Sequence, residues 1–168
     1  EGLTNPNTGE TYGEIYDRSD LKSNRVSLGL SLGYFQPIGN RQTMYLSLRS
    51  RAILSKNLFF NEKYRIGGNR LLRGFNEESI FTPYYTVLSA EYRFFLAKTS
   101  YLFGFFDQAV IESQANPSKA DFPFGFGLGL SLETKAGWFS LSYALGRQEG
   151  NPIDFRTAKI HFGYVNRF

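Results

Sequence analysis

Strict alternation of side-chain size constrains this chain more than any other feature of its sequence. The plainest segment, FPFGFGLGLSLET at 122–134, alternates large apolar side chains with glycine, serine and proline. Successive side chains of an extended strand point to opposite faces, so a period of two over this length predicts a β-strand. Such a strand has one apolar face and one face of small side chains.

The same period recurs in most of the chain, which predicts an all-β, antiparallel protein of seven strands. The other six segments lie at 25–35, 41–54, 84–97, 100–111, 137–146 and 158–168. Segment 100–111 is apolar on both sides, so its faces stay unassigned. Residues 1–22 are polar, and TYGEIYD at 11–17 is a weak candidate for an eighth strand. We therefore expect an N-terminal segment at 1–22 and one β domain at 23–168.

An alternating chain of this kind forms either a soluble sandwich or an outer-membrane barrel. The second face carries mainly glycine and serine with few charges, which is too few for a water-exposed surface. The apolar face carries long ladders of leucine and phenylalanine with tyrosine near their ends. Short connections at 37–40, 97–99 and 134–137 alternate with longer ones at 55–81, 112–121 and 147–155. These features favour a transmembrane β-barrel in the lipid of the bacterial outer membrane.

Charge and composition exclude several other functions. The net charge is +4, from 19 Lys and Arg against 15 Asp and Glu, and it is spread along the chain. A nucleic-acid-binding arm would show a block of like charge, which is absent. The chain has no cysteine and only one histidine, His161. We therefore expect no metal, no cofactor and no enzymatic activity, and we interpret His161 as a polar residue on the inner face.

The C-terminal segment supports the membrane interpretation. Ile160, Phe162, Tyr164 and Phe168 fall on one face of the last predicted strand, and the chain stops at Phe168. This arrangement resembles the C-terminal signature by which outer-membrane barrels are recognised for assembly. An ordinary edge strand that ends at an aromatic residue is the alternative.

The longest connection, 55–81, contains RIGGNRLLRGF and is followed by SAEYRF and GFFDQAV. Together these motifs resemble the BamA/TamA-like superfamily of outer-membrane insertases and secretion translocators. In that family the longest extracellular loop folds back into the barrel, and its tip carries a Val/Ile-Arg-Gly-Phe/Tyr motif. The matching residues here are Leu72, Arg73, Gly74 and Phe75, with leucine in the first place instead of valine or isoleucine. The resemblance implies that the loop docks on the inner wall at Glu91, Phe106 and Asp107.

The resemblance implies a barrel that inserts or translocates other outer-membrane proteins, with unfolded barrel proteins as its clients. A bidentate arginine–carboxylate pair is among the stronger charge-assisted hydrogen bonds, so we expect Arg73 to clamp the loop to Asp107 or Glu91. Arg65, Arg70 and Arg73 as solvated loop residues are the alternative. An oligomerising structural barrel or a passive pore is the alternative function.

The chain also departs from the family, whose members have about sixteen strands and periplasmic POTRA domains. With seven or eight strands and no POTRA-like region, it corresponds to the C-terminal half of such a barrel. No signal peptide is visible at Glu1, so a leader has been removed or the sequence is a piece of a longer one. A closed barrel of eight strands has room only for side chains, so the loop would not fit inside it.

Three arrangements remain. The chain pairs with a second copy, it completes a barrel with a different half, or it closes as a small barrel. Unpaired strand edges are not tolerated in lipid. We therefore expect a homodimer or a complementary half-barrel that gives about sixteen strands.

Overall fold

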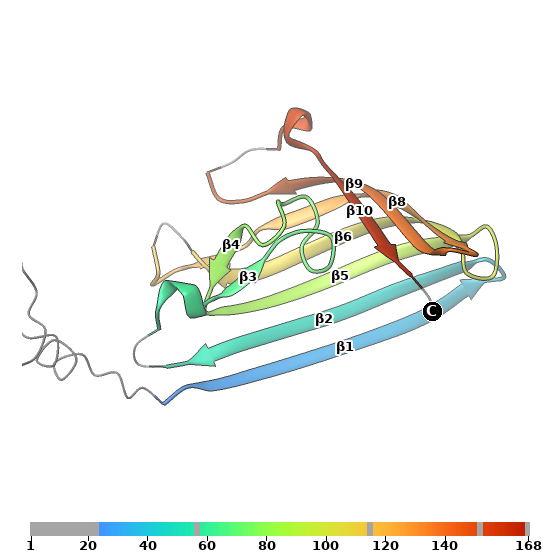
Figure 1. The fold of residues 1–168 in the computed structure, drawn as a ribbon. Helices are drawn as coiled ribbons and strands as arrows, with labels where there is room; N and C mark the ends of the chain where they lie inside the picture. The colour runs from blue at the N-terminus through green and yellow to red at the C-terminus, as the bar shows by residue number, and fades with distance from the viewer. Residues whose placement is uncertain (1–23, 56–57, 114–115, 151–152, 167–168) are drawn as a thin grey trace, which may run out of the picture.

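The computed structural model describes residues 24–55, 58–113, 116–150 and 153–166, and over these ranges the chain is almost entirely β (Figure 1). Two 3-10 turns, η1 (Phe60–Glu62) and η2 (Phe155–Thr157), interrupt the strands. The strands are β1 (Val26–Gly39), β2 (Gln42–Leu54), β3 (Tyr64–Ile66), β4 (Ile80–Thr82), β5 (Tyr84–Phe95), β6 (Tyr101–Glu112), β7 (Ala120–Asp121), β8 (Phe124–Thr134), β9 (Gly137–Arg147) and β10 (Lys159–Val165).

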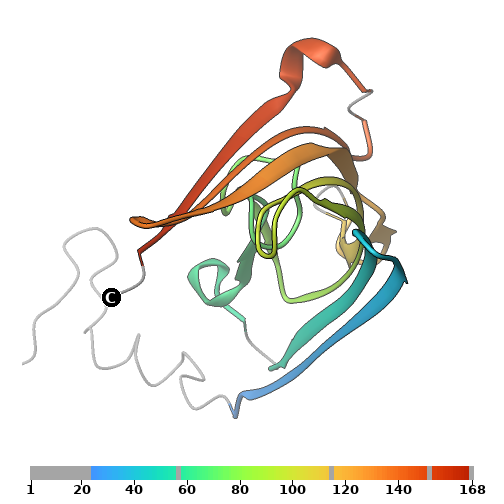
Figure 2. The same cartoon turned by 90° about the vertical axis from the view of Figure 1, so that its right-hand side faces the viewer.

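Seven long strands form one antiparallel sheet in the order β1-β2-β5-β6-β8-β9-β10, and the short β7 pairs with β6. The seven predicted strands are confirmed. The sheet curls into a deep trough that is open on one side (Figure 2). Within the described ranges β1 pairs only with β2, and β10 pairs only with β9, so the sheet does not close into a barrel.

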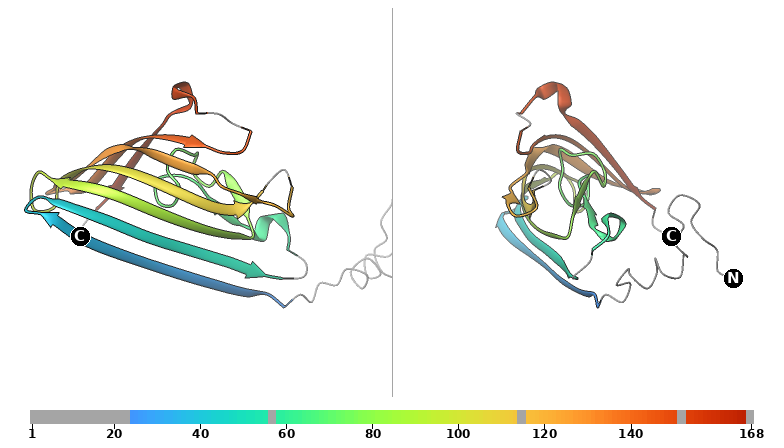
Figure 3. Two further views of the ribbon diagram at one scale, coloured as in Figure 1. Left: turned by 180° about the vertical axis from the view of Figure 1, so that it is seen from behind. Right: turned by 90° about the vertical axis from the view of Figure 1, so that its left-hand side faces the viewer.

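Connection length differs between the two ends of the sheet. The tight turns after β1, β5 and β8 gather at one end, and the longer connections leave from the other (Figures 1 and 3). This agrees with the alternation of short and long connections in the sequence. Outer-membrane barrels have the same asymmetry, with short periplasmic turns and longer extracellular loops.

The convex face of the sheet is apolar and exposed. Leu28, Leu32 and Leu128 are 57%, 56% and 72% exposed. Other large exposed side chains on this face are Leu30, Leu46, Leu88, Leu102, Leu141, Tyr143, Ile160 and Phe162. An apolar surface that extends over all seven long strands is far larger than monomeric soluble proteins tolerate, so this face needs an apolar surrounding.

The structure also resolves the faces of β6. Phe103, Phe105 and Asp107 are buried on the concave side, whereas Leu102 and Phe106 are 46% exposed on the convex side. The sequence left this strand unassigned because both of its faces carry large apolar residues.

Glycines on the concave face of β8 make room for the aromatic rings of β6. A Cβ at Gly129 would clash with the ring of Phe103, and one at Gly127 would lie 2.9 Å from Cζ of Phe105. The inner face of β8 is therefore covered at Gly127 and Gly129 by aromatic rings of β6.

Residues 58–82, here called the folded loop, lie within the trough (Figure 2). Within the folded loop, β3 and β4 pair with each other as a small separate sheet. A compact apolar core joins the folded loop to the inner wall. Its buried members are Ile66, Leu72, Ile80, Tyr85, Val87, Ala109 and Ile111.

Among the described residues, no helix is both long and apolar enough to cross a membrane. The expected segment at 1–22 and the terminal Phe168 lie outside the described residues.

The packing of β8 predicts that Gly127→Ala destabilises the folded protein. The added methyl group would meet backbone atoms of β9 as well as the Phe105 ring, and overpacking of this kind costs about 1–3 kcal/mol. We expect the folded, heat-modifiable band on a gel to disappear at a lower urea concentration.

Gly104→Ala is the matched control, because its Cβ would face the convex side, 3.3 Å from the flexible end of Leu128. Equal urea sensitivity of the two variants would contradict the assigned faces.

Candidate functional site

Arg73, at the tip of the folded loop, binds Asp107 on β6 through three hydrogen bonds. Its Nε donates to Oδ2 of Asp107 at 2.7 Å, and its Nη2 donates to Oδ1 at 2.6 Å. The backbone N–H of Arg73 also donates to Oδ2, at 3.1 Å. The side chain of Arg73 is 9% exposed and that of Asp107 is 1% exposed. The pair is thus buried and bidentate, with the carboxylate gripping both the side chain and the backbone of the loop tip.

Glu91 on β5 is the second carboxylate at this site, and two arginines share it. Arg73 Nη1 donates to Oε1 of Glu91 at 2.6 Å. Arg93, also on β5, donates from Nε and Nη2 to Oε2 at 2.9 and 2.6 Å. The structure thus brings together the two acids between which the sequence left the choice open. We call Arg73, Arg93, Glu91 and Asp107 the charge cluster.

The charge cluster is electrically balanced, with two cations and two anions. Burial by itself lowers the pKa of Arg73, but the hydrogen bonds and charges of Asp107 and Glu91 outweigh it and leave the pKa raised. The guanidinium therefore stays charged. A buried charge without a partner is costly, so each member of the cluster depends on the others.

Register explains why Arg73 reaches Asp107. Asp107 is paired with Ser89 on one side and Gly125 on the other, and Gly125 is in turn paired with Gly146. Because these neighbours are small, they do not cover the Asp107 carboxylate on the concave face, and Arg73 can reach it. A Cβ at Gly125 would clash with the carbonyl oxygen of Arg73, so the loop backbone needs the glycine.

Aromatic rings complete the wall around Arg73. Its Cζ lies 3.7 Å from the centre of the Phe105 ring and 6.0 Å from that of Phe103. Phe106, which we expected at the docking surface, is instead on the convex face, where its ring stacks on Phe124. The period of two explains the correction, because Phe106 and Asp107 are neighbours and must face opposite sides.

Gly74 allows the loop tip to lie flat against the wall. Its φ is +91°, in the region that favours glycine. A Cβ there would lie 2.6 Å from backbone atoms of Leu145 and Gly146 on β9. The N–H of Gly74 donates to Nε2 of His161 on β10, at 3.2 Å. Loop residues 73 and 74 therefore touch five strands of the sheet, β5, β6, β8, β9 and β10.

The role of His161 was missed at the sequence level. Its position on the inner face was expected, but the long sequence separation gave no sign that it contacts Gly74. That it is the chain's single histidine, on a face of small residues, was the only available signal.

The remaining motif residues flank the tip. Leu72 is fully buried in the apolar core, and Phe75 packs against the same core. Arg65 is instead exposed, with an ion pair of 3.8 Å to Glu78. Arg70 is exposed as well, and its carbonyl accepts a hydrogen bond from Arg49. Of the three arginines of this stretch, only Arg73 is buried.

The residues of the expected C-terminal signature take the predicted face as far as the structure describes them. Ile160, Phe162 and Tyr164 are exposed on the convex side, at 72%, 66% and 44%. The hydroxyl of Tyr164 donates to the carbonyl of Ala136 at 2.6 Å, across the tight turn between β8 and β9.

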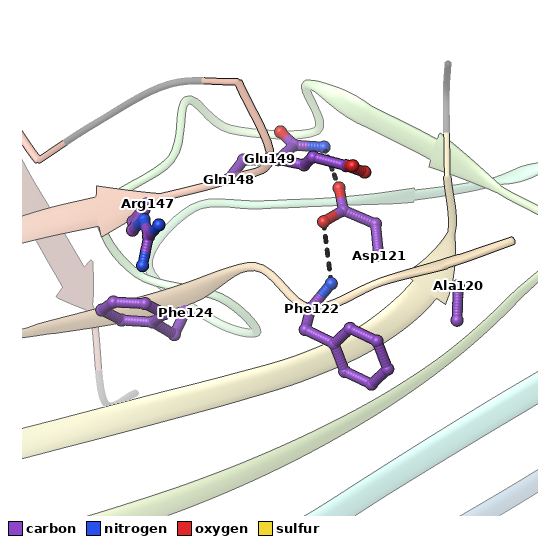
Figure 4. A pocket seen from close by; sticks show the side chains of 7 residues that line it. All are labelled: Ala120, Asp121, Phe122, Phe124, Arg147, Gln148 and Glu149. Carbon is purple, nitrogen blue, oxygen red and sulfur yellow. Dashed lines mark hydrogen bonds between the residues drawn. The ribbon is translucent and has the colours of Figure 1, made fainter. Parts of the chain in front are cut away.

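A separate pocket of about 290 Å³ lies at the long-connection end of the sheet (Figure 4). In it Asp121 accepts hydrogen bonds from the N–H of Phe122 and from Nε2 of Gln148, at 2.8 and 2.9 Å. The pocket does not include the charge cluster. The described residues contain no group of His, Cys, Asp and Glu suited to a metal ion.

The sequence matches the Omp85 superfamily domain over residues 8–168. No match was found among curated proteins. The matched region contains the whole sheet, the folded loop and the charge cluster. The superfamily comprises insertion and translocation machinery of the bacterial outer membrane rather than classical enzymes, which agrees with the apolar convex face. We conclude that this chain belongs to the Omp85 superfamily.

Proposed function

We propose that this chain forms part of the wall of an outer-membrane barrel that inserts or translocates other outer-membrane proteins. In this proposal, Arg73 clamps the folded loop to Asp107 and Glu91 inside the barrel. The clamp sets the shape of the lumen through which a client segment passes or beside which it folds. Unfolded outer-membrane proteins are the clients.

The buried Arg73–Asp107–Glu91 contact carries the proposal. A loop that merely connected two strands would place its arginines in water, as Arg65 is placed. Burial of a charged loop tip against paired carboxylates on the inner wall favours a loop that stays inside the trough, because leaving would break the buried pair. Because these contacts hold the loop tip against several strands of the inner wall, shaping the lumen is the role that fits the clamp best.

A partner completes the barrel in this proposal. β1 and β10 are the edge strands of the described sheet, and both carry exposed apolar residues on their convex faces. In lipid, each unpaired backbone N–H or C=O group on these edges would destabilise the sheet by roughly several kcal/mol. A second copy or a complementary half-barrel satisfies these edges and leaves the trough wide enough for the folded loop.

A non-catalytic structural barrel or passive pore is the second candidate. One observation favours it: the folded loop occupies the trough and contacts β5, β6, β8, β9 and β10 through its core and tip, as a plug would.

Arg73→Lys should release the folded loop to a protease without arginine specificity. One ammonium group cannot reproduce the paired hydrogen bonds to Asp107, although it keeps the charge. Arg73→Ala should have a larger effect, because removing one partner of a buried pair costs about 3–5 kcal/mol. Cleavage is followed by mass spectrometry on protein reconstituted in liposomes.

Arg65→Ala is the control, since Arg65 is exposed on the same loop. Heat modifiability on a gel verifies that the sheet stays folded in every variant. Cleavage of Arg73→Lys at the wild-type rate would remove the clamp from the proposal.

The insertion proposal predicts that liposomes carrying the protein fold a test barrel faster than empty liposomes. Arg73→Lys should reduce this acceleration, and Arg65→Ala should not. No acceleration by the wild-type protein, together with a conductance that rises when Arg73 is replaced, would instead establish the plugged pore.

The completed-barrel proposal predicts a mass above that of one 19.2 kDa chain in detergent. Light scattering with the detergent contribution subtracted measures it directly. A dimer establishes pairing of two copies, and a higher mass with a second polypeptide establishes a complementary half. A heat-modifiable monomer would contradict the proposal.

A further inference from the structure

We propose that Arg93 is a positioning residue that holds Glu91 in place for Arg73 and couples the clamp to the edge strand β1. This inference rests on the proposed function of the clamp. Arg93 lies in the SAEYRF motif, but the resemblance assigns a role only to Glu91 there. The contacts of its guanidinium group carry the argument.

The two oxygens of the Glu91 carboxylate bind different arginines. Arg93 takes Oε2 through two hydrogen bonds, whereas Arg73 takes Oε1 through one. Each oxygen therefore faces a different guanidinium. Arg93 fixes the rotation of the carboxylate and so aims Oε1 at Arg73.

Aromatic rings from three strands in turn surround the Arg93 guanidinium. Its Cζ lies 4.4 Å from the ring centre of Tyr45 on β2, 4.9 Å from Tyr101 on β6 and 5.4 Å from Phe35 on β1. All three distances are in the range of cation–π attraction. We call these three residues the aromatic cradle.

The cradle is ordered by its own ring contacts. Phe35 stacks on Tyr45 with ring centres 4.4 Å apart, and Tyr101 contacts Phe95 at 5.3 Å. The Arg93 side chain is 16% exposed within it. A guanidinium held on several sides by rings and a carboxylate has little rotational freedom, which is what a positioning residue requires.

Arg93 also balances the charge of the cluster. Without Arg93 the buried cluster keeps one cation, Arg73, against two carboxylates. Glu91 would then turn toward water and leave Arg73 with Asp107 alone. Replacement of Arg93 should therefore weaken the hold on the folded loop even though Arg93 does not contact the loop tip.

Coupling to β1 follows from the same contacts. Phe35 lies on β1, the edge strand of the described sheet, and the cradle lies toward its tight-turn end. When Arg73 leaves, Oε1 of Glu91 loses its partner and the restraint on Arg93 relaxes. The hairpin of β1 and β2 should then become more mobile at Phe35 and Tyr45.

The test is a double-mutant cycle on the reconstituted protein with Arg73→Lys and Arg93→Gln. We expect Arg93→Gln to raise loop cleavage by about tenfold, which corresponds to the loss of about 1.4 kcal/mol. In the Arg73→Lys background the same change should add less than it does in the wild type, because both residues act through Glu91. Hydrogen exchange of the peptide covering residues 35–45 should rise in both single variants.

Arg51→Gln is the matched control, an exposed arginine on the inner face of β2. If Arg93→Gln does not give a heat-modifiable protein, Arg93→Lys decides the question. It keeps the charge in the cradle but cannot bind Oε2 through a fork, so a smaller increase in cleavage is expected.

Two outcomes overturn the inference. In the first, the Arg93 variant that folds is cleaved at the wild-type rate. In the second, the fold-increases in cleavage caused by the two substitutions simply multiply in the double variant. If Arg73→Lys frees the loop while Arg93 variants do not, only this inference fails. If neither residue affects the loop, the clamp fails with it.

Discussion

The structure depends on one buried contact, the grip of Asp107 and Glu91 on the Arg73 guanidinium. The neighbouring residues make room for this contact, balance its charge or hold the loop beside it. Gly125 and Gly146 clear the floor of the trough, and the apolar core beneath Leu72 holds the loop at the right depth. Because a charge buried in a low-dielectric wall is costly unless paired, departure of the loop would leave Asp107 without its arginine and Glu91 with Arg93 alone.

The two faces of the sheet differ in chemistry and in what they contact. The convex face is a continuous apolar surface that lipid would cover, while the concave face combines small side chains, aromatic rings and a compact charge cluster. Side chains alternate between the two faces along each strand, so one short chain supplies both surfaces. An apolar outer surface and a loop-binding inner surface are therefore built from the same seven strands.

Open edges are the second constraint. A sheet that ends at β1 and β10 leaves rows of backbone groups without partners among the described residues. Lipid does not hydrogen-bond such groups. The proposals for a completing partner and for coupling through Arg93 both concern this region, because β1 is an edge strand and also carries Phe35 of the aromatic cradle.

The sequence alone determined the seven strands and the faces of all of them except 100–111, because a period of two is written locally in each segment. Its motifs carried the family resemblance and singled out Arg73. It misjudged Phe106, although the inward position of Asp107 already implied that its neighbour faces outward. Only the tertiary structure decided that Arg73 and Arg93 share Glu91, and that His161 accepts a hydrogen bond from the N–H of Gly74. It also decided that the folded loop contains its own two-stranded sheet. These contacts join residues far apart in the chain or depend on side-chain rotation, and no local period records either of them.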